Sequence, residues 1–243
     1  MSDTQPIVPS IPPTLTTNES SRPDVADDVP IPNLLAAVEA LLRQPRRVWL
    51  QLRQGRSSPL IGALLIVALS CAVVYGVVVG AFSGGAQFWA APVKIAGGLL
   101  LSALICLPSL YIFSCLSGSS ARLTEVLGLI AGLLALMTVL LVGFAPVAWV
   151  FSQSTTSLPA MGALHLVFWF VATCFGLRSL CAGFKHLQVR SHGGLFVWII
   201  LFLLVALQMT TALRPILGTA PTFLPGAQEK KFFLSHWSDC LKQ

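Results

Sequence analysis

The sequence predicts an all-α, polytopic membrane protein in which five transmembrane helices follow an amphipathic helix at the membrane interface. Two features of the composition indicate this fold class: 55% of the 243 residues are hydrophobic and only 10% are charged. Soluble domains carry about a quarter charged residues, and the mean hydropathy here is +0.81. The composition excludes an ordinary soluble enzyme, a disulfide-rich domain and, despite the net charge of +6, a protein that binds nucleic acid.

Residues 1–32 are expected to form a disordered cytoplasmic tail. The segment is rich in Pro, Ser and Thr and contains Asp24, Asp27 and Asp28, so its apolar side chains are too few to offset the conformational entropy of folding. A solvated leader is favoured over a partner-binding segment. No cleavable signal peptide is predicted, because the first long apolar run begins near residue 60.

Residues 33–56 predict a basic amphipathic helix that lies in the membrane interface. Asn33 can cap this helix, and Pro45 is expected to kink or split it. Arginine opposite an apolar face with tryptophan is typical of contact with anionic lipid. Packing on a separate protein domain is the alternative, but the sequence offers no such domain. The apolar face comprises Leu34, Leu35, Val38, Leu41, Leu42, Val48, Trp49 and Leu52, and the lipid contact is assigned to Arg43, Arg46, Arg47, Arg53 and Arg56.

Five apolar runs predict a transmembrane bundle over residues 57–213. The spans are expected at residues 60–82, 95–116, 126–151, 161–182 and 194–213. About 20 apolar residues suffice to cross the hydrocarbon core as a helix, and a helix satisfies its own backbone polar groups there. Short connections predict antiparallel neighbours. Residues 214–243 are expected to form an external C-terminal tail.

The basic residues predict a cytoplasmic N-terminus and an external C-terminus, since Lys and Arg favour cytoplasmic segments. This orientation places nine basic residues inside: Arg43, Arg46, Arg47, Arg53, Arg56, Arg122, Arg178, Lys185 and Arg190. It places five outside: Lys94, Arg214, Lys230, Lys231 and Lys242.

Small residues at intervals of four predict faces where helices pack closely. Ala72, Gly76 and Gly80 form such a set in the first span, and Gly128 and Gly132 form another in the third. Two interpretations are open: a seam between two copies of the chain, or packing within one chain. The second is favoured.

Polar residues inside the predicted spans are candidates for function, because they are costly in the bilayer. They are His165, Arg178 and Gln208. The sequence indicates no catalytic, cofactor-binding or metal site. It lacks the metalloprotease, serine-hydrolase, phosphate-loop and dinucleotide motifs, and its six cysteines show no C-x-x-C spacing.

The order of a basic helix and five short-looped spans resembles the Yip family of membrane proteins, and in particular its bacterial relatives. The resemblance covers about residues 34–218 and is carried by Gln44-Pro45-Arg46 to Trp49, Pro92-Val93-Lys94, Cys106 to Tyr111, Phe144 to Trp149, Leu213-Arg214-Pro215 and Gly218. The Asp-Leu-Tyr-Gly-Pro motif of the eukaryotic members is missing, and Tyr75-Gly76 is only a fragment of it. The resemblance implies a scaffold or membrane organiser without an active site, in a bacterial inner membrane.

Three functions are therefore considered. The first is a non-enzymatic scaffold or assembly partner, with the lipid bilayer and either a membrane-protein partner or further copies of the chain as its contacts. The alternative is a small oligomeric transporter or channel lined by His165, Gln208 and helices kinked at Pro108 and Pro146. The third, which is disfavoured, is a lipid-modifying enzyme with Arg178, Lys185 and Arg190 on the headgroups.

Overall fold

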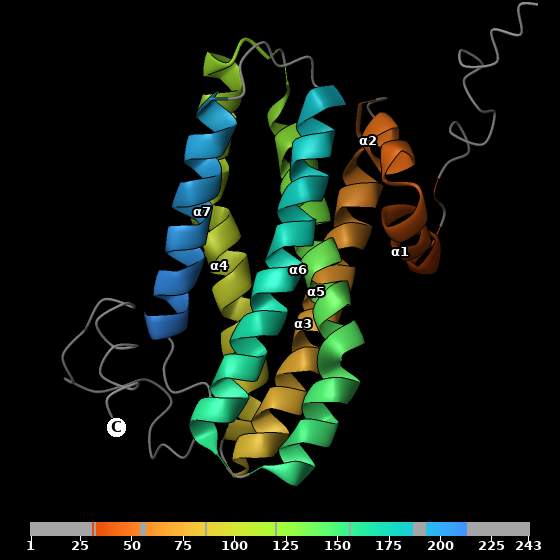
Figure 1. Ribbon diagram of the computed structural model, residues 1–243. Coiled ribbons are helices and arrows are strands. Elements are labelled where there is room, and N and C mark those ends of the chain that lie inside the picture. The colour runs from red at the N-terminus through yellow and green to blue at the C-terminus, as the bar shows by residue number, and fades with distance from the viewer. Residues whose placement is uncertain are drawn as a thin grey trace, which may run out of the picture.

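The computed structural model describes residues 31, 33–53, 57–85, 87–119, 121–155, 157–186 and 193–212. Every regular element in these ranges is a helix, so the all-α fold class is confirmed for them. The helices are α1 (Leu34–Arg43), α2 (Pro45–Arg53), α3 (Ser57–Ser83), α4 (Gln87–Leu116), α5 (Leu123–Ser154), α6 (Leu158–His186) and α7 (Gly193–Ala212) (Figure 1). The predicted tails and Arg56 lie outside the described residues, except for Ile31.

Four helices are long and apolar enough to cross a membrane. They contain the stretches Ser57–Phe82, Phe88–Leu116, Leu123–Ser154 and Ala160–Lys185, whereas the apolar stretch of α7, Gly193–Met209, is no longer than 17 residues. An integral membrane location is compatible with these helices. The fifth span remains a prediction.

One predicted boundary differs clearly from the structure. The sequence interpretation began the second span at residue 95, but α4 begins at Gln87 and runs through Pro92 and Lys94. Phe88 to Ala91 are apolar, so the single charge of Lys94 interrupts the hydropathy pattern and not the helix. Pro92 lacks one backbone donor, but it lies near the helix start and packs on Gly76.

The long helices lie side by side, with α1 and α2 against one side of the bundle, beside its upper half in the view (Figure 1). Helix α5 is central, because most of its apolar stretch is buried inside the bundle. It packs against α3 and α6, while α3 packs on α4 and α4 on α7. This arrangement leaves α7 held mainly by one neighbour.

The segment predicted as one interfacial helix is two helices packed on the bundle. Helix α1 ends at Arg43, Gln44 leaves the helical conformation, and Pro45 begins α2. Proline suits a first helical position because the backbone donor it lacks has no partner there. Both short helices contact α3 and α5, and α2 also contacts α6. The alternative to a membrane-surface helix was packing on a separate protein domain, which the sequence does not contain. In the structure, the two helices pack on the bundle of the same chain.

Candidate functional site

Helix α2 is anchored by side chains that enter glycine notches in the bundle. Trp49 and Leu52 are each 3% exposed. A Cβ atom added at Gly128 would lie 2.5 Å from Cδ2 of Leu52, and one added at Gly132 would lie 2.8 Å from Cη2 of Trp49. Both distances are shorter than a real contact, so α2 approaches α5 this closely only because these positions are glycine.

The third notch belongs to α6. A Cβ atom at Gly183 would lie 3.2 Å from Cδ2 of Trp49 and would also overlap Leu129. Trp49 therefore sits where α2, α5 and α6 meet. Gly183 was not singled out in the sequence, because one glycine shows no spacing pattern.

The predicted small-residue faces both serve contacts within one chain. Gly128 and Gly132 receive α2, as described above. Gly76 lies against the backbone of Pro92 in α4, and Ala72 and Gly80 are buried in the same helix as Gly76. These contacts therefore agree with the interpretation that the small residues pack helices of one chain against each other.

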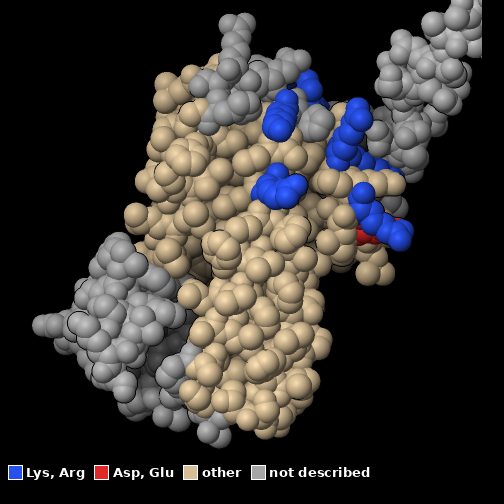
Figure 2. Space-filling model, viewed as in Figure 1, with Lys and Arg blue, Asp and Glu red and all other residues tan. Residues whose placement is uncertain are grey.

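Basic side chains gather at the end of the bundle where α1 and α2 lie (Figure 2). Seven of the eight described Lys and Arg residues are at this end: Arg43, Arg46, Arg47, Arg53, Arg122, Arg178 and Lys185, with Lys94 as the exception. Arg43 pairs with Glu39 at 3.2 Å. Arg46 and Arg53 are exposed, and Arg47 is half-buried.

Tyr75 and His165 form a buried hydrogen bond between α3 and α6. Tyr75 Oη lies 2.6 Å from Nδ1 of His165, and the two residues are 0% and 6% exposed. The His165 ring lies nearly perpendicular to that of Phe168, with 6.4 Å between the ring centroids, and Phe168 stacks on Phe144 of α5 at 4.9 Å. The pair therefore links two helices that flank α5.

The hydrogen bond engages one of the two ring nitrogens of His165. The tautomer of His165 decides whether the Tyr75 hydroxyl or Nδ1 of the ring is the donor, and Nε2 of His165 takes no part in this bond. Within the described residues, this Nε2 is buried without a hydrogen-bond partner.

Helix α7 is tied to α4 by a side chain that the sequence interpretation missed. Trp198 Nε1 donates to the carbonyl oxygen of Cys106 at 3.0 Å, and Trp198 is fully buried. Ser109 Oγ donates to the same oxygen at 2.8 Å. A tryptophan in an apolar run gives no periodic signal, so only the fold reveals this contact.

The remaining polar candidates do not join His165. Arg178 is exposed on α6, and Gln208 is half-buried on α7. Lys94 is 2% exposed, but it lies two positions, about 200° around the helix, from Pro92, which faces α3. The three predicted polar residues and Lys94 therefore occupy different surroundings.

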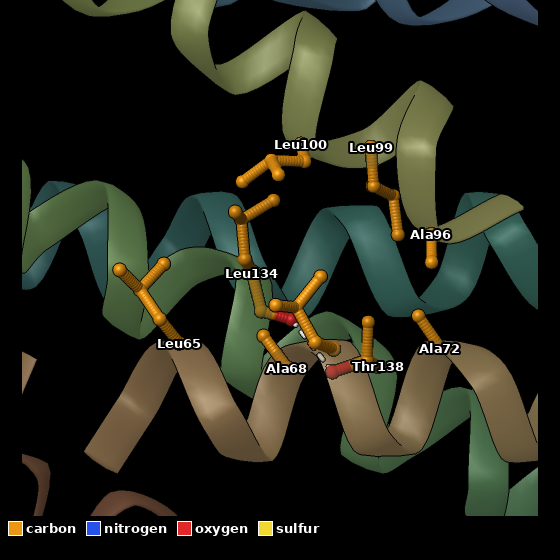
Figure 3. Close-up of a pocket in the computed structure, with 9 residues that line it drawn as sticks. Leu65, Ala68, Ala72, Ala96, Leu99, Leu100, Leu134 and Thr138 are labelled. Carbon is orange, nitrogen blue, oxygen red and sulfur yellow. Dashed lines mark hydrogen bonds between the residues drawn. The ribbon is translucent and has the colours of Figure 1, made fainter. Parts of the chain in front are cut away.

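A small apolar notch lies between α3, α4 and α5 (Figure 3). Its volume is about 10 Å³, which is the space of one water molecule. Its polar side chain, Thr138, donates to the carbonyls of Leu134 at 2.9 Å and Ala135 at 3.1 Å in its own helix. The notch thus offers neither the room nor the polar groups to hold a polar substrate.

In the described part of the chain, no three metal-ligating side chains come together. Comparisons with models of known protein families, with curated proteins and with solved structures find no match.

Proposed function

We propose that this chain is a non-enzymatic integral membrane protein that acts as a scaffold or assembly partner. The observation that carries the proposal is the docking of α2, in which Trp49 enters the notches at Gly132 and Gly183. This contact fixes an arginine-bearing helix at one end of an apolar bundle. A fixed, charged surface presents itself to headgroups or a partner protein at little further cost in conformational entropy.

The polar groups of the bundle support a structural role. Tyr75 and His165 bind each other, Trp198 binds the backbone of α4, and Thr138 binds its own helix. Each of these contacts ties helices together or satisfies a backbone carbonyl. None leaves a nucleophile and a base arranged at a cavity.

The placement in the membrane belongs to the same proposal. Helices α3 to α6 would cross the bilayer with α7 as a fifth span, and α1 and α2 would lie at the cytoplasmic surface with Arg43, Arg46, Arg47, Arg53 and Arg56 toward anionic headgroups. The N-terminus would be cytoplasmic and the C-terminus external, in a bacterial inner membrane. The basic residues at one end of the bundle support this orientation. The likeness to the Yip family is retained as part of the proposal.

Affinity purification with a disabling variant tests the scaffold. The tagged chain is purified in mild detergent at native expression, and co-purifying proteins are identified by mass spectrometry. We expect a stoichiometric partner whose recovery falls about tenfold or more in Gly132→Leu, which expels Trp49. The matched control is Gly143→Leu, since Gly143 lies in the same helix with nothing within 4 Å of an added Cβ. Recovery of the chain alone, or a partner insensitive to Gly132→Leu, would contradict the proposal.

A small oligomeric transporter is the second candidate, and one observation favours it. His165 lies seven residues after the start of α6, about two turns into the helix, and buried polar groups at such depth are typical of ion pathways. Purified protein in liposomes should then conduct an ion, and His165→Ala and Tyr75→Phe should both abolish the flux. No flux from the wild-type chain under a proton, sodium or potassium gradient would reject a pathway for these ions.

A further inference from the structure

We propose that the outer face of α6 binds one anionic phospholipid, with its phosphate held between Arg178 and Lys185. The site goes beyond the proposed scaffold role, and it rests on the membrane placement proposed above. It is a discrete binding site for one lipid molecule, distinct from the general attraction of the arginines of α1 and α2 to the membrane surface.

Arg178 and Lys185 occupy one stripe of α6. They are seven residues apart, which is close to two full turns and about 10 Å of rise. Both are exposed. The opposite side of the helix is buried, because Gly176 meets Met137 of α5 and Gly183 meets Trp49 of α2. The stripe therefore faces away from the protein and toward the bilayer.

The depth of Arg178 requires a phosphate rather than hydrocarbon around its guanidinium group. Arg178 lies eight residues before the end of α6 at His186, about 12 Å along the axis. Its neighbour one turn toward the middle of the helix, Phe175, is apolar and 53% exposed, and the apolar exposed surface of α6 continues to Phe170 and Val167. A charged group in such surroundings is stabilised when its long side chain reaches the phosphate layer.

The alignment and the length of the two side chains allow one shared phosphate. The Cα–Cβ bonds of both residues tilt toward the helix N-terminus, so the rise of about 10 Å between them is bridged when the long side chain of Arg178 turns back toward Lys185 and the headgroups. A guanidinium group binds phosphate through two parallel hydrogen bonds, and an ammonium group binds it as a point charge. The two cations can therefore bind the same phosphate, each from a different level along α6.

The carboxylates in the described part of the chain are engaged elsewhere. Glu39 pairs with Arg43 at 3.2 Å, and Glu125 accepts from the backbone nitrogen of Arg122 at 3.1 Å. Neither neutralises Arg178 or Lys185. The net positive charge of this surface therefore calls for an anion from the surroundings.

Helix α2 adds positive charge on the side next to α6. Leu52, Trp49 and Arg46 follow at intervals of three, so each is turned by about 60° in the same sense. Leu52 meets α5 at Gly128, and Trp49 meets α6 at Gly183, so exposed Arg46 comes next on the α6 side. Basic side chains lie over both α6 and α2 on the same face of the molecule (Figure 2).

The occupant is an anionic phospholipid with an uncharged headgroup, and phosphatidylglycerol is the probe. Its single negative charge complements the two cations. Phosphatidylcholine would bring its own ammonium group toward Lys185. The acyl chains of the bound lipid would lie along Phe170 and Val167.

Native mass spectrometry of the full chain tests the site. The protein in detergent is mixed with equimolar phosphatidylglycerol and phosphatidylcholine, and the fraction carrying one lipid of each kind is measured. We expect the wild type to retain phosphatidylglycerol in preference. Arg178→Gln and Lys185→Gln should each lower its retention about fivefold, the effect of one basic residue at a membrane surface.

Arg122→Gln is the matched control, because it removes the same charge at the same end of the molecule from an exposed residue at the start of α5 that is assigned to no lipid contact. Retention in this variant should equal that of the wild type. Phosphatidylglycerol retention by Arg178→Lys should fall between that of the wild type and that of Arg178→Gln, because lysine keeps the charge but loses the bidentate geometry of arginine. If Arg178→Gln fails to fold, Arg178→Lys provides the test. Equal loss in Arg122→Gln and Arg178→Gln would show a general field effect, and no loss in any variant would show no site. Either result overturns the proposal.

Discussion

The ring of Trp49 in α2 fills the space that a side chain at Gly132 in α5 would occupy: an added Cβ would lie 2.8 Å from Cη2 of Trp49. These residues belong to the two segments that the sequence assigned to the membrane surface and to the membrane core. Their contact makes α2 part of the protein interior on one side and a carrier of arginines on the other.

Gly132→Ala is expected to weaken the docking of α2. The added methyl group meets the Trp49 ring, and overpacking of this kind costs about 1–3 kcal/mol. The free energy of unfolding, measured in mixed detergent micelles, should fall by that amount. Gly143→Ala in the same helix has open space around the new Cβ, so it should leave stability unchanged or raise it by up to about 1 kcal/mol. Equal effects of the two variants on the free energy of unfolding would contradict the close contact between Trp49 and Gly132.

Gly76→Ala is expected to separate α3 from α4. The new Cβ would overlap the backbone of Pro92, and backbone cannot move aside as a flexible side chain can. We expect a loss of about 3 kcal/mol. Gly97→Ala in α4, where the added atom meets nothing within 4 Å, is the control. A stable Gly76→Ala protein would show that the two helices do not meet at Pro92.

Tyr75→Phe and His165→Leu are expected to be coupled. Either change removes the 2.6 Å hydrogen bond and leaves the remaining polar partner buried and unpaired. The double variant should therefore lose less free energy of unfolding than the sum of the two single variants. A coupling energy of about 1 kcal/mol is expected for such a bond within a membrane bundle. Tyr75→Phe combined with Trp198→Phe is the reference pair, and its effects should simply add.

Trp198→Phe is expected to loosen α7 without unfolding the other helices. The variant keeps most of the buried ring and loses the donor to the Cys106 carbonyl, at a cost of about 0.5–1.5 kcal/mol. Hydrogen exchange should rise in α7 first, because its main contact is with α4. Uniform exchange in all helices would argue against this hydrogen bond as the tie of α7.

Much of the helical layout could be predicted from the sequence, because each apolar run is long enough to need its own helix. The division of the basic segment at Pro45 was also predictable, since proline fixes its own backbone locally. The start of α4 was not, because Lys94 lowers the local hydropathy although the helix continues through it.

The contacts between helices could not be predicted. The partners Tyr75 and His165 are separated by 90 residues, and no spacing rule connects them. The same holds for Trp198 and Cys106. The amphipathic pattern of α2 did show which face is apolar, but a lipid surface and the side of a bundle select the same pattern. Only the glycines of α5 and α6 distinguish the two surfaces, through the shape they give the bundle.

The docked position of α2, and the cytoplasmic side proposed for it, are tested most directly by labelling single cysteines in a background without the native ones. Gln44→Cys places a thiol at an exposed site between α1 and α2, and Leu52→Cys places one in the buried contact with Gly128. The account predicts that a membrane-impermeant maleimide labels Gln44→Cys in inside-out vesicles and not in intact cells, and that Leu52→Cys reacts only after denaturation. Rapid labelling of Leu52→Cys in native vesicles would contradict the docking, and labelling of Gln44→Cys in intact cells would contradict the orientation.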